Sequence, residues 1–95
     1  MKQLKQTSQF KKDLKRYKFN ATKLEALKVV LQFLAETGVV PEDYLPHYLT
    51  GDYAGFLECH VENDFLLIWF DEANDEIRLV RLGTHAELFG KGRKR

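Results

Sequence analysis

The chain has 95 residues, of which 44% are hydrophobic, 13% are aromatic and two are proline. This composition favours a single folded domain with a small core, and it excludes a disordered chain and a second domain. The lone Cys59 excludes an internal disulfide, as is typical of the reducing cytosol. Residues 1–10 are too polar for a signal peptide, and the longest apolar run, Phe65 to Phe70, is too short to cross a membrane. We therefore expect a soluble, cytoplasmic protein.

The net charge of +1 hides a strong asymmetry along the chain. Residues 1–28 hold nine basic and two acidic residues, residues 29–89 hold two basic and twelve acidic residues, and residues 90–95 add four basic ones. Basic ends around an acidic middle indicate a surface for nucleic acid or an acidic partner; the alternative is a solvated helix face. We predict that residues 90–95 form a flexible basic tail.

The N-terminal third predicts a strand followed by a basic amphipathic helix. Residues 1–6 are compatible with a short strand, and Thr7 or Ser8 can cap the helix that follows. Apolar residues then repeat at helical spacing at Phe10, Leu14 and Tyr17. The lysines of this helix fall mostly on its other face, at Lys11, Lys12, Lys15 and Lys18.

A second helix is predicted to begin at a capping box formed by Thr22 and Glu25. Its apolar stripe consists of Leu24, Leu27, Leu31 and Leu34. Gly38 is a typical helix stop. Because only residues 19–21 separate the two helices, we expect them to form an antiparallel hairpin.

The second half of the chain changes to strand patterns after a connecting loop at residues 39–51. Strands are predicted at residues 53–61, 65–70 and 76–82, with turns at 62–64 and 71–75 and a break at Gly83. The chain therefore predicts an α+β fold in one domain, residues 1–95. In this fold an N-terminal strand and a helical hairpin pack on a small, mainly antiparallel sheet.

Three histidines, His47, His60 and His85, lie beside predicted turns or strand ends. Two imidazoles can serve as base and acid near neutral pH, which is what RNA transesterification requires. Asp64 is placed to orient an imidazole, and Phe89 to stack on a base. A cation must also offset the charge on the phosphorane. The only cations of residues 29–89 are Arg78 and Arg81, whose spacing of three predicts opposite faces of a regular strand, so that only one can serve the site.

Two other interpretations of these residues must be weighed. A histidine on a strand is often only structural. A zinc site is disfavoured because the usual ligand pairs are missing and the neighbours Cys59 and His60 point to opposite faces of a strand. We therefore expect neither a metal nor another cofactor.

Four separated blocks in the second half of the chain resemble the YafQ-like toxins of type II toxin–antitoxin systems, a branch of the RelE/ParE superfamily. They keep the order and gaps of that family. The blocks are His47 to Gly51, Gly55 to Val61, Asp64 to Ile68 and Arg81 to Phe89.

The resemblance implies a RelE-like fold and a ribosome-dependent endoribonuclease that cleaves messenger RNA in the A site without a metal. It implies catalytic roles for His47, His60, Asp64 and His85, with His85 favoured as acid and His60 or His47 as base. It also implies substrate contacts by Phe89 and by Arg81, the latter as the phosphate-stabilising cation. Glu58 precedes His60 by two residues and so shares its face of the strand, where it can orient that imidazole. From the charge pattern, we expect the basic helix residues Lys11, Lys12 and Lys15 to supply contacts to the ribosome.

The resemblance further implies a cognate antitoxin as partner, beside the ribosome and messenger RNA, with DNA bound only through the antitoxin. No membrane partner is expected. Two alternatives on the same fold remain at this stage. One is a ParE-like gyrase inhibitor, and the other is a noncatalytic RNA-binding module.

Overall fold

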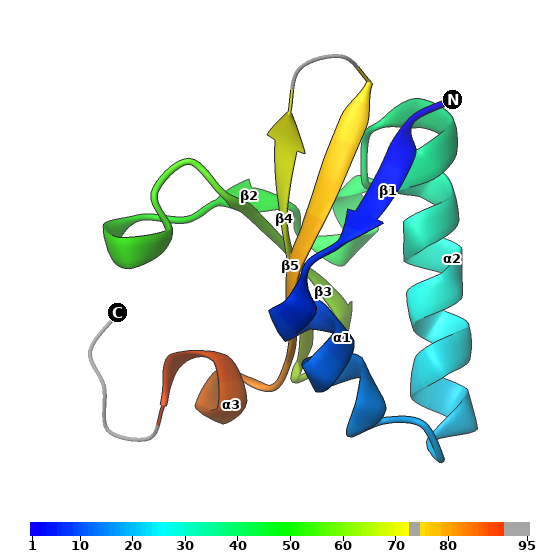
Figure 1. Cartoon of the computed structure of the whole chain (residues 1–95), viewed down its shortest axis with the longest axis vertical. Helices are drawn as coiled ribbons and strands as arrows, with labels where there is room; N and C mark the ends of the chain where they lie inside the picture. The colour runs from blue at the N-terminus through cyan, green and yellow to red at the C-terminus, as the bar shows by residue number, and fades with distance from the viewer. Residues whose placement is uncertain (73–74, 91–95) are drawn as a thin grey trace.

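The computed structural model describes residues 1–72 and 75–90, in which two helices cover one face of a five-stranded sheet and a short helix lies at the other (Figure 1). The predicted tail falls outside the described residues from residue 91 on. The strand order is β1-β5-β4-β3-β2, with β1 parallel to β5 and the other pairs antiparallel. The elements are β1 (Gln3–Gln6), α1 (Ser8–Lys15), α2 (Ala21–Thr37), β2 (His47–Tyr48), β3 (Leu57–Glu62), β4 (Phe65–Glu72), β5 (Glu76–Gly83) and α3 (His85–Phe89).

The ends of the first two helices follow from local hydrogen bonds. The Thr7 side chain accepts a hydrogen bond from the Phe10 backbone N–H and caps α1, as predicted. The capping box predicted for α2 is wrong, because α2 begins earlier and the Asn20 side chain caps it. Asn20 is an equally good capping residue, placed two positions ahead of Thr22. Gly38 ends α2 in the left-handed conformation, as predicted.

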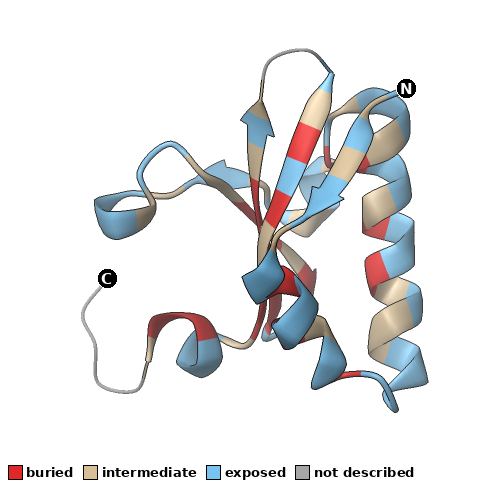
Figure 2. Ribbon diagram, viewed as in Figure 1, coloured by how far each residue is buried: buried red, intermediate tan, exposed pale blue. Residues whose placement is uncertain are grey.

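Both helices pack on the same face of the sheet, with α1 against β5 and α2 against β3. A turn at residues 16–20 joins them, which fits the predicted hairpin connection. Their apolar residues and one side of the central strands form a first core (Figure 2). Its fully buried members include Phe10, Val30, Leu34, Cys59, Phe65, Leu67, Ile77 and Leu82.

The strand boundaries differ from the prediction at three places. Residues 47–48 pair with β3 inside the predicted loop, and a two-residue strand has no periodicity to detect. Residues 51–53 form a 3-10 turn, so that β3 begins only at Leu57. Strand β4 continues to Glu72 because its polar end still pairs with β5. The first and third differences reflect strand pairing, which local patterns do not reveal.

A β-bulge in β5 corrects the prediction for the two arginines. Ile68 of β4 pairs with Arg81, and the next residue, Trp69, pairs with Leu79, which leaves Val80 as an extra residue in β5. The bulge shifts the alternation by one residue. Arg78, opposite Phe70, and Arg81 therefore lie on the same face of the sheet, the face away from α1 and α2.

Beyond the end of β1, Asp13 of α1 occupies the edge of β5. Its carboxylate is fully buried and accepts hydrogen bonds from Arg81 Nε at 2.8 Å, Arg81 Nη2 at 3.3 Å and the Leu82 backbone N–H at 2.9 Å. Burial by itself raises the pKa of Asp13, but the hydrogen bonds from Arg81 and Leu82 outweigh it and hold the pKa below its usual value. Asp13 is thus an ionised anchor between the first helix and the sheet.

We predict that Asp13→Asn lowers the free energy of unfolding by about 3 kcal/mol, because it leaves the Arg81 charge half-buried without its counter-ion. Urea unfolding at pH 7 measures this, with the exposed Asp43→Asn as control. The folded-state pKa of Asp13 is lowered, so its stabilisation is present above about pH 4 and is lost as the pH falls further. The variant should lack that part of the acid sensitivity. Equal urea midpoints for both variants and the wild type would contradict the role of Asp13.

Candidate functional site

The three histidines form a row on the face of the sheet away from α1 and α2. His47 comes from β2, His60 from β3, and His85 is the first residue of α3. The ring centroids of His47 and His60 lie 6.3 Å apart, and those of His60 and His85 lie 6.1 Å apart. Three separate elements therefore place beside one another the three imidazoles that the family resemblance implied for the site.

One end of the row is a pair between His85 and Asp64. Asp64 Oδ1, in the turn between β3 and β4, accepts hydrogen bonds from His85 Nδ1 at 2.7 Å and from the His85 backbone N–H at 2.9 Å. These two hydrogen bonds, the backbone one first, lower the pKa of Asp64. An ionised Asp64 can only accept, so Nδ1 of His85 carries the proton. The other ring nitrogen, Nε2, is then the one left for substrate on a half-exposed side chain.

The other end of the row is a pair between His47 and Glu58. His47 Nδ1 lies 2.9 Å from the Leu45 carbonyl oxygen, which only accepts, so Nδ1 carries a proton. His47 Nε2 lies 3.2 Å from Glu58 Oε1, a contact across which the two groups can share a proton. The prediction that Glu58 orients His60 is therefore wrong, because Glu58 pairs across the sheet with His47.

Glu58 is almost fully buried, with 3% of its surface exposed. Its second oxygen, Oε2, has no hydrogen-bond partner in the described part of the chain. Burial raises the pKa of Glu58, while the nearby histidines, His47 above all, lower it without cancelling the rise. A raised pKa brings this carboxyl closer to the ordinary pKa of an imidazole, which favours proton exchange between Glu58 and His47.

His60 lies between the two pairs. Its Nδ1 is 3.4 Å from the carbonyl oxygen of Asn63, a long hydrogen bond within the turn that also carries Asp64. This contact favours the proton on Nδ1 and leaves the lone pair of the neutral ring on Nε2. His60 is therefore suited to accept a proton.

An aromatic cluster that the sequence analysis largely missed borders the histidines. Tyr53 contacts Phe89 and Phe56 edge to face, with ring centroids 5.9 and 5.8 Å apart, over a second core that includes Leu66 and Ile68. Phe89 is only 9% exposed, and its ring lies 6.2 Å from that of His85. Both Tyr53 and Phe56 fall in the strand predicted at residues 53–61, whereas in the structure Tyr53 ends a 3-10 turn and Phe56 precedes β3.

The predicted substrate cations are not gathered at the histidines. Arg81 uses Nε and Nη2 on Asp13, and its Nη1 lies 3.4 Å from the Tyr53 hydroxyl. Lys11, Lys12 and Lys15 are exposed on α1, which packs on the other face of the sheet. Two of them, Lys11 and Lys15, line a surface groove with Leu14, Lys18, Leu24 and Gln6. The lysines therefore form a separate basic surface.

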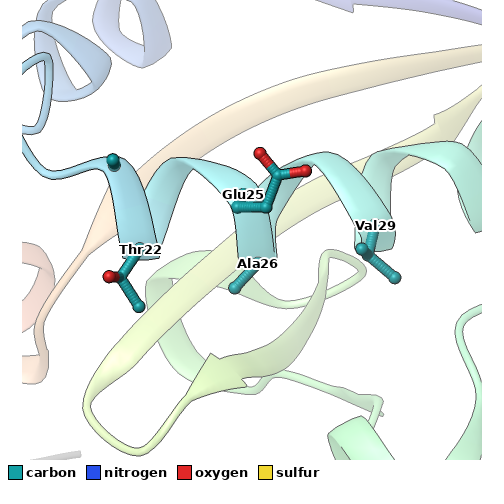
Figure 3. A pocket seen from close by; sticks show the side chains of 5 residues that line it. Thr22, Glu25, Ala26 and Val29 are labelled. Carbon is teal, nitrogen blue, oxygen red and sulfur yellow. The ribbon is translucent and has the colours of Figure 1, made fainter.

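A surface hollow on another part of the molecule has no histidine in its lining. It is shown in Figure 3, lies along α2 and is lined by Ala21, Thr22, Glu25, Ala26 and Val29. Cys59 is buried in the first core, where desolvation raises its pKa to about 12. Among the described residues, no group of three or more His, Cys, Asp or Glu side chains is arranged to hold a metal ion. No helix in the described ranges is long and apolar enough to span a bilayer.

The fold and the site together define a small α+β protein equipped for general acid–base chemistry at an exposed row of imidazoles. The family model described as "Bacterial toxin of type II toxin-antitoxin system, YafQ" matches residues 2–90. The chain therefore belongs to the YafQ family of bacterial type II toxins, and the predicted resemblance is confirmed.

Curated and solved relatives agree with this family. The mRNA interferase toxin YafQ of Escherichia coli K12 is 34% identical over 86 residues, which cover 88% of this chain and 91% of the relative. The structure of the E. coli DinJ-YafQ toxin–antitoxin complex has a chain with a TM-score of 0.80 and 32% identity, covering 94% of this chain and 98% of that one. A metal-bound toxin from Helicobacter pylori has a TM-score of 0.81 and 36% identity, covering 94% and 100%. The predicted enzyme class, endoribonuclease, is the class of the curated relatives.

We predict that His47→Ala raises the pKa of Glu58 further, because His47 is the largest of the influences that lower it against the effect of burial. Titration of the carboxyl carbons by NMR measures this directly. His85→Ala, which removes a smaller influence on the same carboxyl, is the matched comparison and should raise the pKa less. A Glu58 pKa that is unchanged in His47→Ala would show that the two groups do not share a proton.

Proposed function

We propose that this protein is an endoribonuclease that cleaves messenger RNA in the ribosomal A site by metal-independent transesterification. The observation that carries the proposal is the row of His47, His60 and His85, closed at each end by a carboxylate. The naming of the curated relatives as mRNA interferases supports the substrate class.

In the proposed mechanism, His60 Nε2 takes the proton of the ribose 2′-hydroxyl, whose oxygen then attacks the adjacent phosphorus. His85 Nε2 donates a proton to the leaving 5′-oxygen, and Asp64 stabilises the His85 imidazolium that precedes this step. The upstream product carries a 2′,3′-cyclic phosphate and the downstream product a 5′-hydroxyl. No metal is needed, because acid, base and charge stabilisation suffice for this attack.

His47 and Arg81 are assigned supporting roles. Both ring nitrogens of His47 are occupied, by Leu45 and Glu58, so we assign to its imidazolium form the electrostatic stabilisation of the phosphorane. Arg81 was predicted to stabilise the phosphorane. Because Arg81 donates hydrogen bonds to Asp13 and to the Tyr53 hydroxyl, we assign it the role of holding Tyr53 in place instead. Phe89, being largely buried, acts on the substrate by supporting the ring of His85.

The position of the basic surface supports ribosome dependence. Lys11, Lys12 and Lys15 lie on a different face from the histidines, so one short RNA strand gains little from both surfaces at once. A large polyanionic particle that contacts α1 while presenting messenger RNA to the histidines uses both. We propose that the ribosome is this particle.

We also propose an antitoxin as the protein partner of this chain. The support is the E. coli relative solved in a complex named for DinJ and YafQ as a toxin–antitoxin pair. On this proposal the partner silences the toxin in the cytoplasm, and any DNA binding belongs to the partner.

One set of variants separates catalysis from docking. His60 and His85 are partly or largely exposed, so replacing either with alanine should change the free energy of unfolding by about 1 kcal/mol or less. Loss of the base or the acid should slow single-turnover cleavage about 10²- to 10⁴-fold. Rapid-quench cleavage of messenger RNA on ribosomes measures the rate, with the exposed Gln32→Ala on α2 as control.

The lysine variants, in contrast, should affect ribosome binding and not the cleavage step. Replacing Lys11, Lys12 and Lys15 together with alanine should weaken ribosome binding with a reduced salt dependence and leave the rate at saturation near normal. The triple exchange to arginine keeps the charge and should restore binding. Full toxicity of His60→Ala and His85→Ala would refute the catalytic assignment, and growth arrest with intact messages would favour a gyrase inhibitor.

A further inference from the structure

The helix that carries His85 is too short to hold its own position. Helix α3 has five residues, and an isolated helix of that length is not stable in water. The capping box between Thr84 and Glu87 caps its start, and a hydrogen bond from the His85 N–H ties that start to Asp64 in the turn between β3 and β4. Leu88 and Phe89 of the helix are buried in the second core. The capping box fixes the start of the helix to itself and does not attach it to the rest of the protein.

A further long-range hydrogen bond attaches this helix to the helical layer. The Tyr17 hydroxyl, just after α1, donates to Glu87 Oε1 at 2.6 Å. The same carboxylate oxygen accepts the Thr84 backbone N–H at 3.0 Å, so one atom joins the cap of α3 to the end of α1. Figure 1 shows α1 and α3 on either side of the lower end of β5, past the end of β1. Tyr17 therefore connects the helical layer with the site face.

The surroundings of Tyr17 and Glu87 fit a fixed contact. Tyr17 is 8% exposed and its ring packs on Phe65, with centroids 4.7 Å apart. Burial, and then the Glu87 carboxylate, raise the pKa of the Tyr17 hydroxyl, so it stays a donor throughout the neutral range. At Gly83 a Cβ atom would lie 2.5 Å from Glu87 Oε1 and 3.3 Å from Glu87 Cβ. Only glycine leaves room there for the carboxylate in this position.

We propose that Tyr17 is a positioning residue of the nuclease site, which through Glu87 fixes the start of α3 and so sets the His85 imidazole against Asp64 and His60. The inference rests on the proposed function. Tyr17 touches neither substrate nor the reacting atoms in this mechanism. It acts only through the place and orientation of His85.

The first test is Tyr17→Phe, which removes the hydroxyl and keeps the ring on Phe65. We expect single-turnover cleavage at saturating ribosomes to slow roughly 10-fold, since small misplacements of a catalytic group are costly, while the concentration for half-saturation stays the same. In the free protein, the NMR signals of the His85 ring nitrogens should shift, reporting a weakened contact to Asp64. Tyr44→Phe, which removes a hydroxyl from another partly buried tyrosine, is the control and should change neither.

Three further variants test the connection itself. Glu87→Gln retains a side-chain oxygen for Tyr17 and Thr84 and should behave almost as the wild type. Glu87→Ala and Gly83→Ala both remove the carboxylate from its place and should shift the His85 signals. In the Glu87→Ala background, Tyr17→Phe should have no additional effect on the rate, because the two residues act as one unit.

The outcomes separate this inference from the proposed function. Wild-type rates and His85 signals in Tyr17→Phe would overturn it, and so would a loss of stability without a change in either readout. A shifted His85 spectrum in a protein whose His85→Ala variant still cleaves normally would uphold the positioning by Tyr17 and refute the nuclease assignment instead.

Discussion

The buried carboxylate of Asp13 is the contact on which the rest of this structure depends. Strand β1 pairs with β5 only as far as Leu79, and beyond that point β5 would have an unpaired edge. The Thr7 hydroxyl donates to the Val80 carbonyl oxygen, and Asp13 accepts the Leu82 N–H and two nitrogens of Arg81. These bonds hold the bulged part of β5 that leads directly into Gly83, Thr84 and the helix of His85. A displacement of this edge of β5 would therefore displace His85 as well.

The sheet separates two tasks. Its helical face carries the larger core and, on the outer side of α1, the basic surface; the other face carries the histidine row and the aromatic cluster. Two of the contacts that join the helical layer to the site face are polar and specific, those of Asp13 with Arg81 and of Tyr17 with Glu87. Helix α1 thus serves both as the proposed docking element and as a support of the face that carries the histidine row. This arrangement explains how a chain of 95 residues holds both surfaces.

Much of the fold could be predicted from local patterns, because the helices and the central strands have clear apolar periods and Gly38 is a strong stop. The candidate site came mostly from the family resemblance, since three scattered histidines have no spacing that brings them together. What escaped prediction depends on pairing across the fold. The partner of Glu58 is His47 rather than its strand neighbour His60. The bulge at Val80 places Arg81 on the same face of the sheet as Arg78. Contacts between residues about 70 positions apart leave no local pattern.

The central claim is that imidazoles cut ribosome-bound messenger RNA through its own 2′-hydroxyl. The most direct measurement is the chemistry of the new ends when purified protein cuts a message on ribosomes stalled at a defined codon, compared with the same message carrying a 2′-deoxy nucleotide at the cut and with free RNA. The account predicts a 2′,3′-cyclic phosphate and a 5′-hydroxyl at a cut within the A-site codon, no cut at the deoxy position, and little cutting of free RNA. A 5′-phosphate with a 3′-hydroxyl, or cleavage at the deoxy position, would contradict it.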